Sequence, residues 1–144
     1  MIRIIAIGKI KETYLVNMVE DYFKRINKYH RLEILEVSDS NPKEEAEKIL
    51  SKIENNGFNI ALSINGKKLN SLTFAKELDQ NLMRHAKINF IIGGSNGLSE
   101  VILKIVNEQI SFGDLTFPHG LFRAILLEQI YRGFKIINNE SYHK

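Results

Sequence analysis

The sequence predicts an α/β fold with a mainly parallel sheet and helices on both faces of that sheet. Short β-branched runs alternate along the chain with amphipathic patterns of helical period, which is typical of βαβ units. The chain has 144 residues, of which 44% are hydrophobic, and this suits one domain with a substantial core. No repeat, linker or low-complexity segment interrupts it, so residues 1–144 are expected to form a single domain.

The chain begins with the pattern of a strand, a helix and a second strand. Ile2–Ile7 is a β-branched run closed by Gly8, as expected of a strand that is covered on both faces. Leu32–Val37 alternates apolar and charged residues, which predicts a strand near an edge of the sheet. Between them, from Tyr14 onward, apolar residues recur at helical spacing: Leu15, Met18, Val19, Tyr22, Phe23 and Ile26.

A strong start signal marks the second helix. Asn41 is a good capping residue, Pro42 suits the first helical position, and Glu44 follows three residues after the cap. The buried face of this helix is expected to consist of Ala46, Ile49, Leu50 and Ile53. The run Asn55-Asn56-Gly57 is the expected end of the helix.

The middle of the chain predicts two strands around a third helix. Residues 58–64 form the first strand, and Asn65-Gly66 indicates a turn after it. Ser71 is the expected cap of the helix, whose inner face holds Phe74, Leu78 and Leu82. Ile88–Ile92 is a second strongly apolar strand.

The last third of the chain predicts two helices around a short strand. Ser99 is the expected cap of a short helix that buries Ile102, Ile105 and Val106. Residues 109–112 form a brief strand, and a long helix runs from Pro118 to about Ile137. Residues 138–144 form a polar tail.

Composition excludes several classes of protein. The chain contains no Cys, so disulfides, thiolate catalysis and zinc ribbons are excluded. Its four His residues show no metal-ligand spacing, and no metal site is expected. No apolar run reaches the ~20 residues of a membrane helix and no signal peptide is recognisable, so we expect a cytoplasmic protein without a membrane partner. The net charge of +3 permits a nucleic-acid partner without demanding one.

Ligands of parallel α/β sheets bind in loops beyond the carboxyl ends of the strands, and three segments take that position: 63–70, 93–99 and 113–120. The glycines of segment 93–99 permit either a tight turn or close approach of a ligand, but they match neither the dinucleotide fingerprint nor the Walker loop. Residues 112–119 offer apolar side chains and backbone amides, which suits either a connecting loop or an adenine pocket.

The C-terminal part offers candidate polar groups. His119 lies at the start of the last helix, where the helix dipole disfavours a positive imidazole. That helix is apolar on two sides, which indicates either a central core helix or, as we favour, a subunit interface. Arg123, Arg132 and Lys135 either hold phosphate or face solvent. The tail has residue types suited to base stacking, although most tails are disordered.

Several motifs, in order and over the whole chain, resemble those of a known family. The motifs are Ile7-Gly8-Lys9, Ile64-Asn65-Gly66-Lys67, Ile92-Gly93-Gly94-Ser95-Asn96-Gly97-Leu98, Ser111-Phe112-Gly113-Asp114-Leu115-Thr116-Phe117-Pro118-His119, Glu128-Gln129-Ile130-Tyr131-Arg132-Gly133-Phe134-Lys135-Ile136 and the terminal Tyr142-His143-Lys144. With them the chain resembles the ribosomal RNA large subunit methyltransferase H family, small bacterial enzymes of the SPOUT class.

This resemblance implies a fold and an activity. The fold is an α/β domain with a C-terminal trefoil knot, an exception to the rule against threaded chains. The activity is transfer of a methyl group from S-adenosylmethionine to N3 of a pseudouridine in 23S ribosomal RNA. The enzymes of the family act as homodimers, on the assembled ribosome and without a metal.

The resemblance also implies roles for individual residues. The cofactor contacts correspond to Leu62, Gly93, Gly94, Phe112, Gly113, Asp114, Leu115, Thr116 and Phe117. The positions associated with the RNA substrate and the reaction correspond to His119, Arg132, Tyr142 and His143, with Lys144 in the same tail. Gly120 and Gly133 replace larger residues of the family, and the loop near residues 38–41 is shorter, but neither departure touches the cofactor loops.

Two other interpretations remain open at this stage. One is a nucleotide-binding α/β protein that uses the glycine turn at residues 93–97 for phosphates. The other is a non-catalytic RNA-binding or ribosome-binding α/β module.

Overall fold

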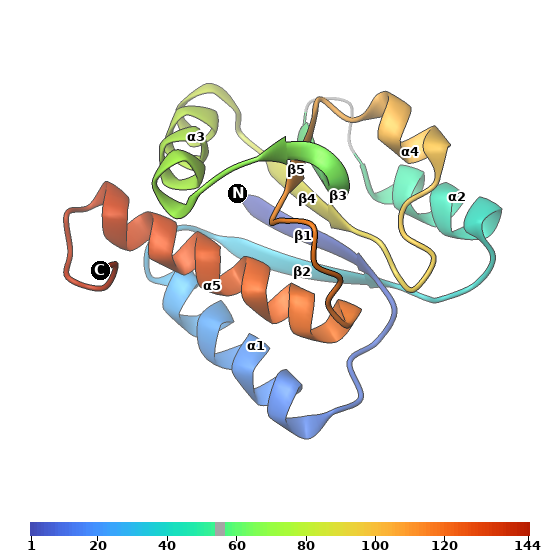
Figure 1. The fold of residues 1–144 in the computed structure, drawn as a ribbon, viewed down its shortest axis with the longest axis horizontal. Coiled ribbons are helices and arrows are strands. Elements are labelled where there is room, and N and C mark those ends of the chain that lie inside the picture. The colour runs from blue at the N-terminus through green and yellow to red at the C-terminus, as the bar shows by residue number, and fades with distance from the viewer. Residues whose placement is uncertain (54–56) are drawn as a thin grey trace.

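The computed structural model describes residues 1–53 and 57–144, and its centre is a five-stranded sheet in the order β2-β1-β4-β3-β5 (Figure 1). Every strand pairs in parallel with its neighbours. The strands are β1 (Ile2–Ile7), β2 (Leu32–Val37), β3 (Phe58–Lys68), β4 (Ile88–Ile92) and β5 (Glu108–Ser111). The parallel sheet and the edge position of β2 are therefore confirmed.

Helices cover both faces of the sheet, as predicted (Figure 1). They are α1 (Thr13–Asn27), α2 (Pro42–Lys52), α3 (Ser71–Arg84), α4 (Glu100–Ile105) and α5 (His119–Ile137). Successive residues of β1 divide between the two sides, because Ile4 packs in one cluster with α1, α3 and α5, and Ile5 packs in another with α2 and α4. Among the described residues, no helix combines the length and the apolarity needed to cross a membrane.

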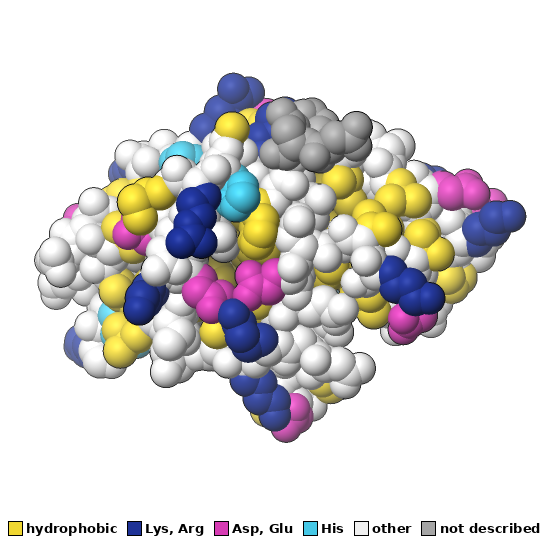
Figure 2. All heavy atoms as spheres, turned by 90° about the horizontal axis from the view of Figure 1, so that it is seen from above, with side chains coloured by type: hydrophobic (Ala, Val, Ile, Leu, Met, Phe, Trp, Pro, Cys, Tyr) yellow, Lys and Arg dark blue, Asp and Glu magenta, His cyan; other side chains and the backbone are white. Residues whose placement is uncertain are grey.

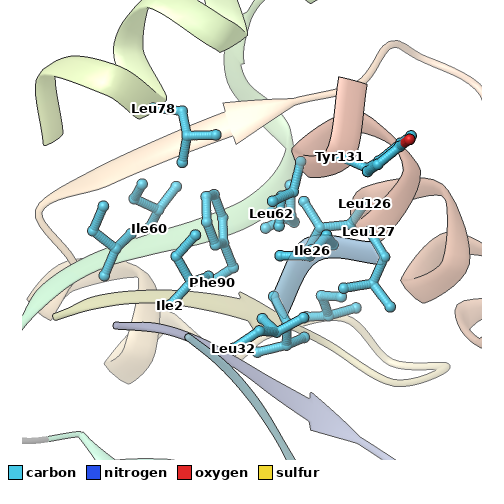
Figure 3. Close-up of a cluster of buried hydrophobic side chains, with 14 of the residues drawn as sticks. Ile2, Ile26, Leu32, Ile60, Leu62, Leu78, Phe90, Leu126, Leu127 and Tyr131 are labelled. Carbon is cyan, nitrogen blue, oxygen red and sulfur yellow. The ribbon is translucent and has the colours of Figure 1, made fainter. Parts of the chain in front are cut away.

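The larger core lies between the sheet and α1, α3 and α5 (Figure 3). Phe90 of β4 is its largest fully buried side chain, with 1% of its surface exposed. Both apolar stripes of α5 also belong to this core, since Leu126, Leu127 and Ile130 are fully buried. The helix lies against α1 and α3 as well as the sheet, so it must be apolar on more than one side. The core interpretation is thus confirmed for the buried members of both stripes, whereas the subunit interface stays a prediction for the partly exposed Phe122, Ile125 and Ile137.

The predicted turn at Asn65-Gly66 is wrong, because β3 continues through it to Lys68. The pairing with β5 shifts between Leu62 and Lys67, which marks an irregularity of the ladder. A Cβ atom on Gly66 would lie 2.6 Å from the backbone nitrogen of Ile110. Glycine is thus required here by the close approach of two strands rather than by a turn.

Some helix boundaries also differ from expectation. The cap of α3 is Asn70, not Ser71, and it forms a capping box in which its side chain accepts from the Thr73 amide at 2.8 Å. The predicted cap of α2 is confirmed, since Asn41 accepts from the Glu44 amide at 2.9 Å. That helix ends at Lys52, whereas Asn55 and Asn56, where its end was expected, lie outside the described residues.

The short helix α4 follows Ser99, which occupies the N-cap position but makes no side-chain capping bond. The helix ends at Ile105, one residue before Val106, whose backbone is extended. Ile102 is its fully buried residue, whereas Ile105 is 46% exposed. The expected inner face is therefore confirmed at Ile102 and wrong at Ile105.

Phe90→Ala should lower the free energy of unfolding by about 3–5 kcal/mol, because it removes a buried ring and leaves a cavity. Urea unfolding followed by circular dichroism measures the loss. Leu72→Ala is the control, since Leu72 is 57% exposed, and it should cost about 0.5 kcal/mol or less. Equal losses for the two variants would contradict the assignment of the core.

Candidate active site

The three predicted segments meet at the carboxyl end of the sheet, although residues 63–68 belong to β3 rather than to a loop. Leu62 of β3 pairs with Ile110 of β5, one residue before Ser111, where β5 ends. On its other side, the pairing of Ala61 with Ile91 places Leu62 level with Ile92, the last residue of β4. The glycine turn at 93–97 and the loop at 112–118 therefore leave the sheet on either side of Leu62.

Two adjoining cavities, here called the Phe112 cavities, open at this edge. The smaller, of about 90 Å³, is lined by Leu62, Ser63, Ile64, Ile110, Ser111, Phe112, Gly113, Leu115, Phe117 and Phe122. The larger, of about 340 Å³, is lined by Leu69, Asn70, Ser71, Phe74, Phe112, Phe117, Ile125 and Gln129. Phe112 and Phe117 belong to both. Five of the nine predicted cofactor residues thus line one hollow: Leu62, Phe112, Gly113, Leu115 and Phe117.

Local contacts fix the loop that forms the wall of these cavities. The Ser111 hydroxyl donates to the Gly113 carbonyl and accepts from the Gly113 amide, both at 3.1 Å. Gly113 has a φ of +119°, a conformation that L side chains rarely adopt. Asp114 points outward, 2.8 Å from the Lys68 ammonium. Asp114 and Thr116 are exposed and do not line the Phe112 cavities.

The glycine turn is tight enough to explain its glycines without a ligand. The Gly97 amide donates to the Gly94 carbonyl at 3.0 Å. A Cβ atom on Gly93 would lie 2.5 Å from the Gly97 carbonyl carbon, and one on Gly94 would lie 3.0 Å from the Ile7 side chain. Gly93 and Gly94 therefore lie at the predicted edge, but they pack on the turn itself and on β1, outside the walls of the Phe112 cavities.

His119 borders a separate hollow of about 440 Å³, here called the His119 cavity. Its walls come from the loops after β1 and β2 and from the starts of α1 and α5: Gly8, Lys9, Ile10, Lys11, Glu12, Leu15, Ser38, Asp39, Pro118, His119 and Gly120. Lys9 and Lys11 are exposed at its rim. His119 follows Phe117 by two residues, so the Phe112 cavities and the His119 cavity lie on either side of Pro118.

Arg123 holds one wall of this region in place. It is 2% exposed, and its guanidinium donates to the Gly8 carbonyl at 2.9 Å and to the Glu36 carboxylate at 2.7 Å. Both partners belong to the chain, so the suggestion that Arg123 either holds a phosphate or faces solvent is corrected. It ties α5 to the ends of β1 and β2.

Arg132, Tyr142 and His143 lie together at the far end of α5. The Arg132 guanidinium carbon lies 4.7 Å from the centre of the Tyr142 ring. Its Nη1 lies 3.1 Å from Nδ1 of His143, and because a guanidinium only donates, that Nδ1 accepts and the ring proton is on Nε2. The tail is thus folded onto its own helix rather than disordered.

Tyr142 is anchored by hydroxyl contacts on two helices. Its hydroxyl donates to Glu128 at 3.1 Å and lies 3.4 Å from the hydroxyl of Tyr22 in α1. Burial raises the pKa of the Tyr142 phenol well above its usual range, and the hydrogen bond with Tyr22 and the charge of Glu128 add to the shift. The phenol therefore keeps its proton at neutral pH, and Glu128 accepts that proton in a hydrogen bond.

The four predicted substrate residues thus form two groups rather than one. His119 is thirteen residues before Arg132 on the same helix, so about 20 Å separates their backbones. Sequence reasoning missed Glu128 and Tyr22, which hold the second group. The i,i+4 spacing of Glu128 and Arg132 was a readable signal, whereas nothing in the sequence pairs Tyr22 with the tail.

Comparison with known proteins identifies the family. A family model described as "Predicted SPOUT methyltransferase" matches residues 1–143. The chain belongs to the SPOUT methyltransferase family. Within it, proteins of Enterococcus faecalis and Carboxydothermus hydrogenoformans are 44% and 47% identical, and each alignment covers 99% of this chain and 99% of the relative. Both are named "Ribosomal RNA large subunit methyltransferase H", so the family indicated by the motifs is confirmed.

Solved structures of SPOUT proteins share the fold. The tRNA (m1G37) methyltransferase of Aquifex aeolicus matches with a TM-score of 0.57 at 19% identity, covering 91% of this chain and 69% of that one. AviRb of Streptomyces viridochromogenes, a SpoU methyltransferase in complex with the cofactor AdoMet, matches with a TM-score of 0.51 at 9% identity, covering 90% and 56%. These likenesses establish the fold, and they confirm the predicted class.

Gly93→Ala should disturb this SPOUT domain more than Gly94→Ala. The methyl group at 93 would collide with the Gly97 backbone, whereas the one at 94 meets a side chain of Ile7 that can shift. We expect Gly93→Ala to cost roughly 2 kcal/mol or more of unfolding free energy, and Gly94→Ala about half of that or less. Thermal unfolding of the two variants compares them, and a reversed order would contradict the geometry of the turn.

Proposed function

We propose that this chain transfers a methyl group from S-adenosylmethionine to N3 of a pseudouridine in 23S ribosomal RNA, on the assembled ribosome and as a homodimer. The observation that carries the proposal is the position of the Phe112 cavities, which are lined by residues that the family resemblance assigns to the cofactor. Full-length identity of 44–47% to proteins named for ribosomal RNA methylation supports the substrate class.

The Phe112 cavities suit an adenosine-containing cofactor. Aromatic rings of Phe112 and Phe117 and the side chain of Leu62 form an apolar wall, and the larger hollow of about 340 Å³ lies within the ~300–1,000 Å³ of ordinary small-ligand sites. When bound there, S-adenosylmethionine supplies an activated methyl group on a sulfonium. Leu62, Phe112 and Phe117 would hold the adenosine, with main-chain groups of residues 112–117. The trefoil knot of the family is part of the same expectation.

Methylation at a ring N–H requires that the nitrogen lose its proton, so a proton acceptor is needed. Tyr142 keeps its own proton, and Nδ1 of His143 already accepts from Arg132. We therefore assign the acceptor role to His119, whose imidazole borders an open cavity two residues beyond Phe117. Lys9 and Lys11 at the rim are suited to phosphates of the RNA.

A second copy of the chain would join the two groups of residues. Within one chain, about 20 Å of rigid helix separates His119 from Arg132, so the tail cluster of one copy is expected to serve the cavities of its partner. A dimer also pools two modest net charges of +3. On the face in Figure 2, Lys and Arg side chains are interspersed with Asp and Glu, which fits recognition of a ribosome by shape more than by charge alone.

The function is tested by mass spectrometry of 23S ribosomal RNA from a strain that lacks the gene, before and after complementation. We expect loss and restoration of one methylated pseudouridine. Calorimetry should show binding of S-adenosylmethionine and none of ATP or NAD. Unchanged RNA with bound S-adenosylmethionine would refute the substrate, and ATP binding would favour a nucleotide-binding protein instead. If the RNA carries no methyl group and the chain binds ribosomes but not S-adenosylmethionine, the chain is a non-catalytic module.

Deletion of residues 142–144 should abolish methylation while leaving the affinity for S-adenosylmethionine within about twofold. Within one chain no tail residue lines the Phe112 cavities, and in the proposed dimer the tail of the partner subunit meets the base of the RNA rather than the adenosine. Methylation assays and calorimetry on the purified variant measure both quantities. Circular dichroism checks that the shortened chain is folded. Full methylation by the folded variant would show that the tail is dispensable.

A further inference from the structure

One carboxylate, that of Glu128 on α5, holds the C-terminal tail and Arg132 together. Its Oε1 accepts from the Tyr142 hydroxyl at 3.1 Å and from Nε of Arg132 at 3.0 Å, and it pairs with Nη2 of Arg132 at 2.5 Å. Only 16% of the Glu128 side chain and 24% of the Arg132 side chain are exposed, so solvent screens this pair less than an open surface pair. The chain turns back on α5 at the point where these contacts form (Figure 1).

These contacts determine the orientation of the guanidinium. Its five N–H groups lie in one plane, so fixing Nε and Nη2 against Glu128 also fixes the direction of Nη1. Nη1 is the group that reaches Nδ1 of His143 at 3.1 Å. The hydrogen bond from Arg132 leaves the proton of His143 on Nε2, and the His143 side chain is exposed.

We propose that Glu128 is a positioning residue of the reaction: through Arg132 it sets the tautomer of His143, so that His143 presents an Nε2–H donor to the substrate. This inference rests on the proposed function. The acceptor is a carbonyl oxygen of the pyrimidine ring next to N3, where negative charge accumulates once N3 has lost its proton. A donor fixed before the reaction stabilises that charge at no cost of reorganisation. His143 thus acts as a hydrogen-bond donor, and the proton goes to another group.

Glu140 provides a matched control. It is a second carboxylate beside the tail, and it accepts from the Tyr29 hydroxyl at 2.9 Å and from the Lys135 ammonium at 3.2 Å. Neither oxygen of Glu140 is paired with Arg132 or His143 in these contacts. Glu140→Gln therefore removes a charge near the tail and leaves the contacts of Glu128, Arg132 and His143 unchanged.

The first measurement follows the His143 tautomer by two-bond ¹H–¹⁵N correlation of the imidazole rings, above neutral pH, where imidazoles are generally uncharged. The full-length protein should show His143 protonated on Nε2. Glu128→Gln keeps the size of the side chain but replaces the charged carboxylate with a neutral amide that has a single acceptor oxygen, so it should hold Arg132 less firmly and give a mixture of tautomers. Glu128→Ala, which removes the acceptor altogether, should do the same. Glu140→Gln should keep the native pattern. An unchanged His143 signal in folded Glu128→Gln would overturn the inference.

The second measurement is methylation kinetics on ribosomal particles. Because the donor acts on charge that develops during the reaction, Glu128→Gln should lower kcat and kcat/KM together, by roughly tenfold or more, with KM within about twofold. Glu140→Gln should retain both values. A raised KM with unchanged kcat would assign Glu128 to substrate binding and refute its role in positioning. If the wild-type chain methylates no ribosomal RNA, the proposed function fails, and the tautomer measurement alone then decides whether Glu128 positions His143.

Discussion

Burial of α5 between α1, α3 and the sheet is the constraint on which the rest of the structure depends. Leu126, Leu127 and Ile130 are fully buried, so the helix can neither rotate nor slide without exposing apolar surface. Its polar residues are thereby restricted to what the packing leaves uncovered. His119 lies at its start beside the strand ends, and Glu128 and Arg132 lie near its end beside the tail.

The buried guanidinium of Arg123 connects this helix to the end of the sheet where the ligand loops lie. It reaches the Gly8 carbonyl at the end of β1 and Glu36 in β2, and both contacts orient the loop that forms the wall of the His119 cavity. A buried guanidinium is costly unless it is paired, so this connection contributes more to a defined geometry than to net stability. Gly8 lines the His119 cavity, so its contact with Arg123 holds this part of the wall against α5.

Much of the fold could be predicted because local patterns and tertiary packing agree. The runs of β1 and β4 are buried as expected, and the exposed Asn41 makes its expected capping hydrogen bond. The stripe of α1 faces the core, with Leu15 and Ile26 buried and its other members partly buried. The turn at Asn65-Gly66 failed because a neighbouring strand, which no local pattern reveals, requires the glycine. The stripes of α5 were ambiguous for a similar reason: apolar residues on two sides look alike whether a helix of the same chain or of another covers them.

The position of the apolar hollow of the candidate site could be predicted from the sequence, whereas the grouping of its polar residues could not. Phe112 and Phe117 are near in sequence and follow a strand, so their shared cavity could be placed by the topology rule alone.

The cluster around Arg132 depends instead on a tail that folds back and on Tyr22 from α1, 120 positions away from Tyr142. Such contacts exist only once the core has formed. The hydrogen bonds within the cluster are nevertheless well matched. Arg132 donates to Glu128 and to Nδ1 of His143, and this leaves the imidazole proton on Nε2. The packing of α5 keeps this cluster about 20 Å from His119 within one chain. This separation is the observation that supports the proposal of a second copy, because one copy alone does not bring the two groups of residues together.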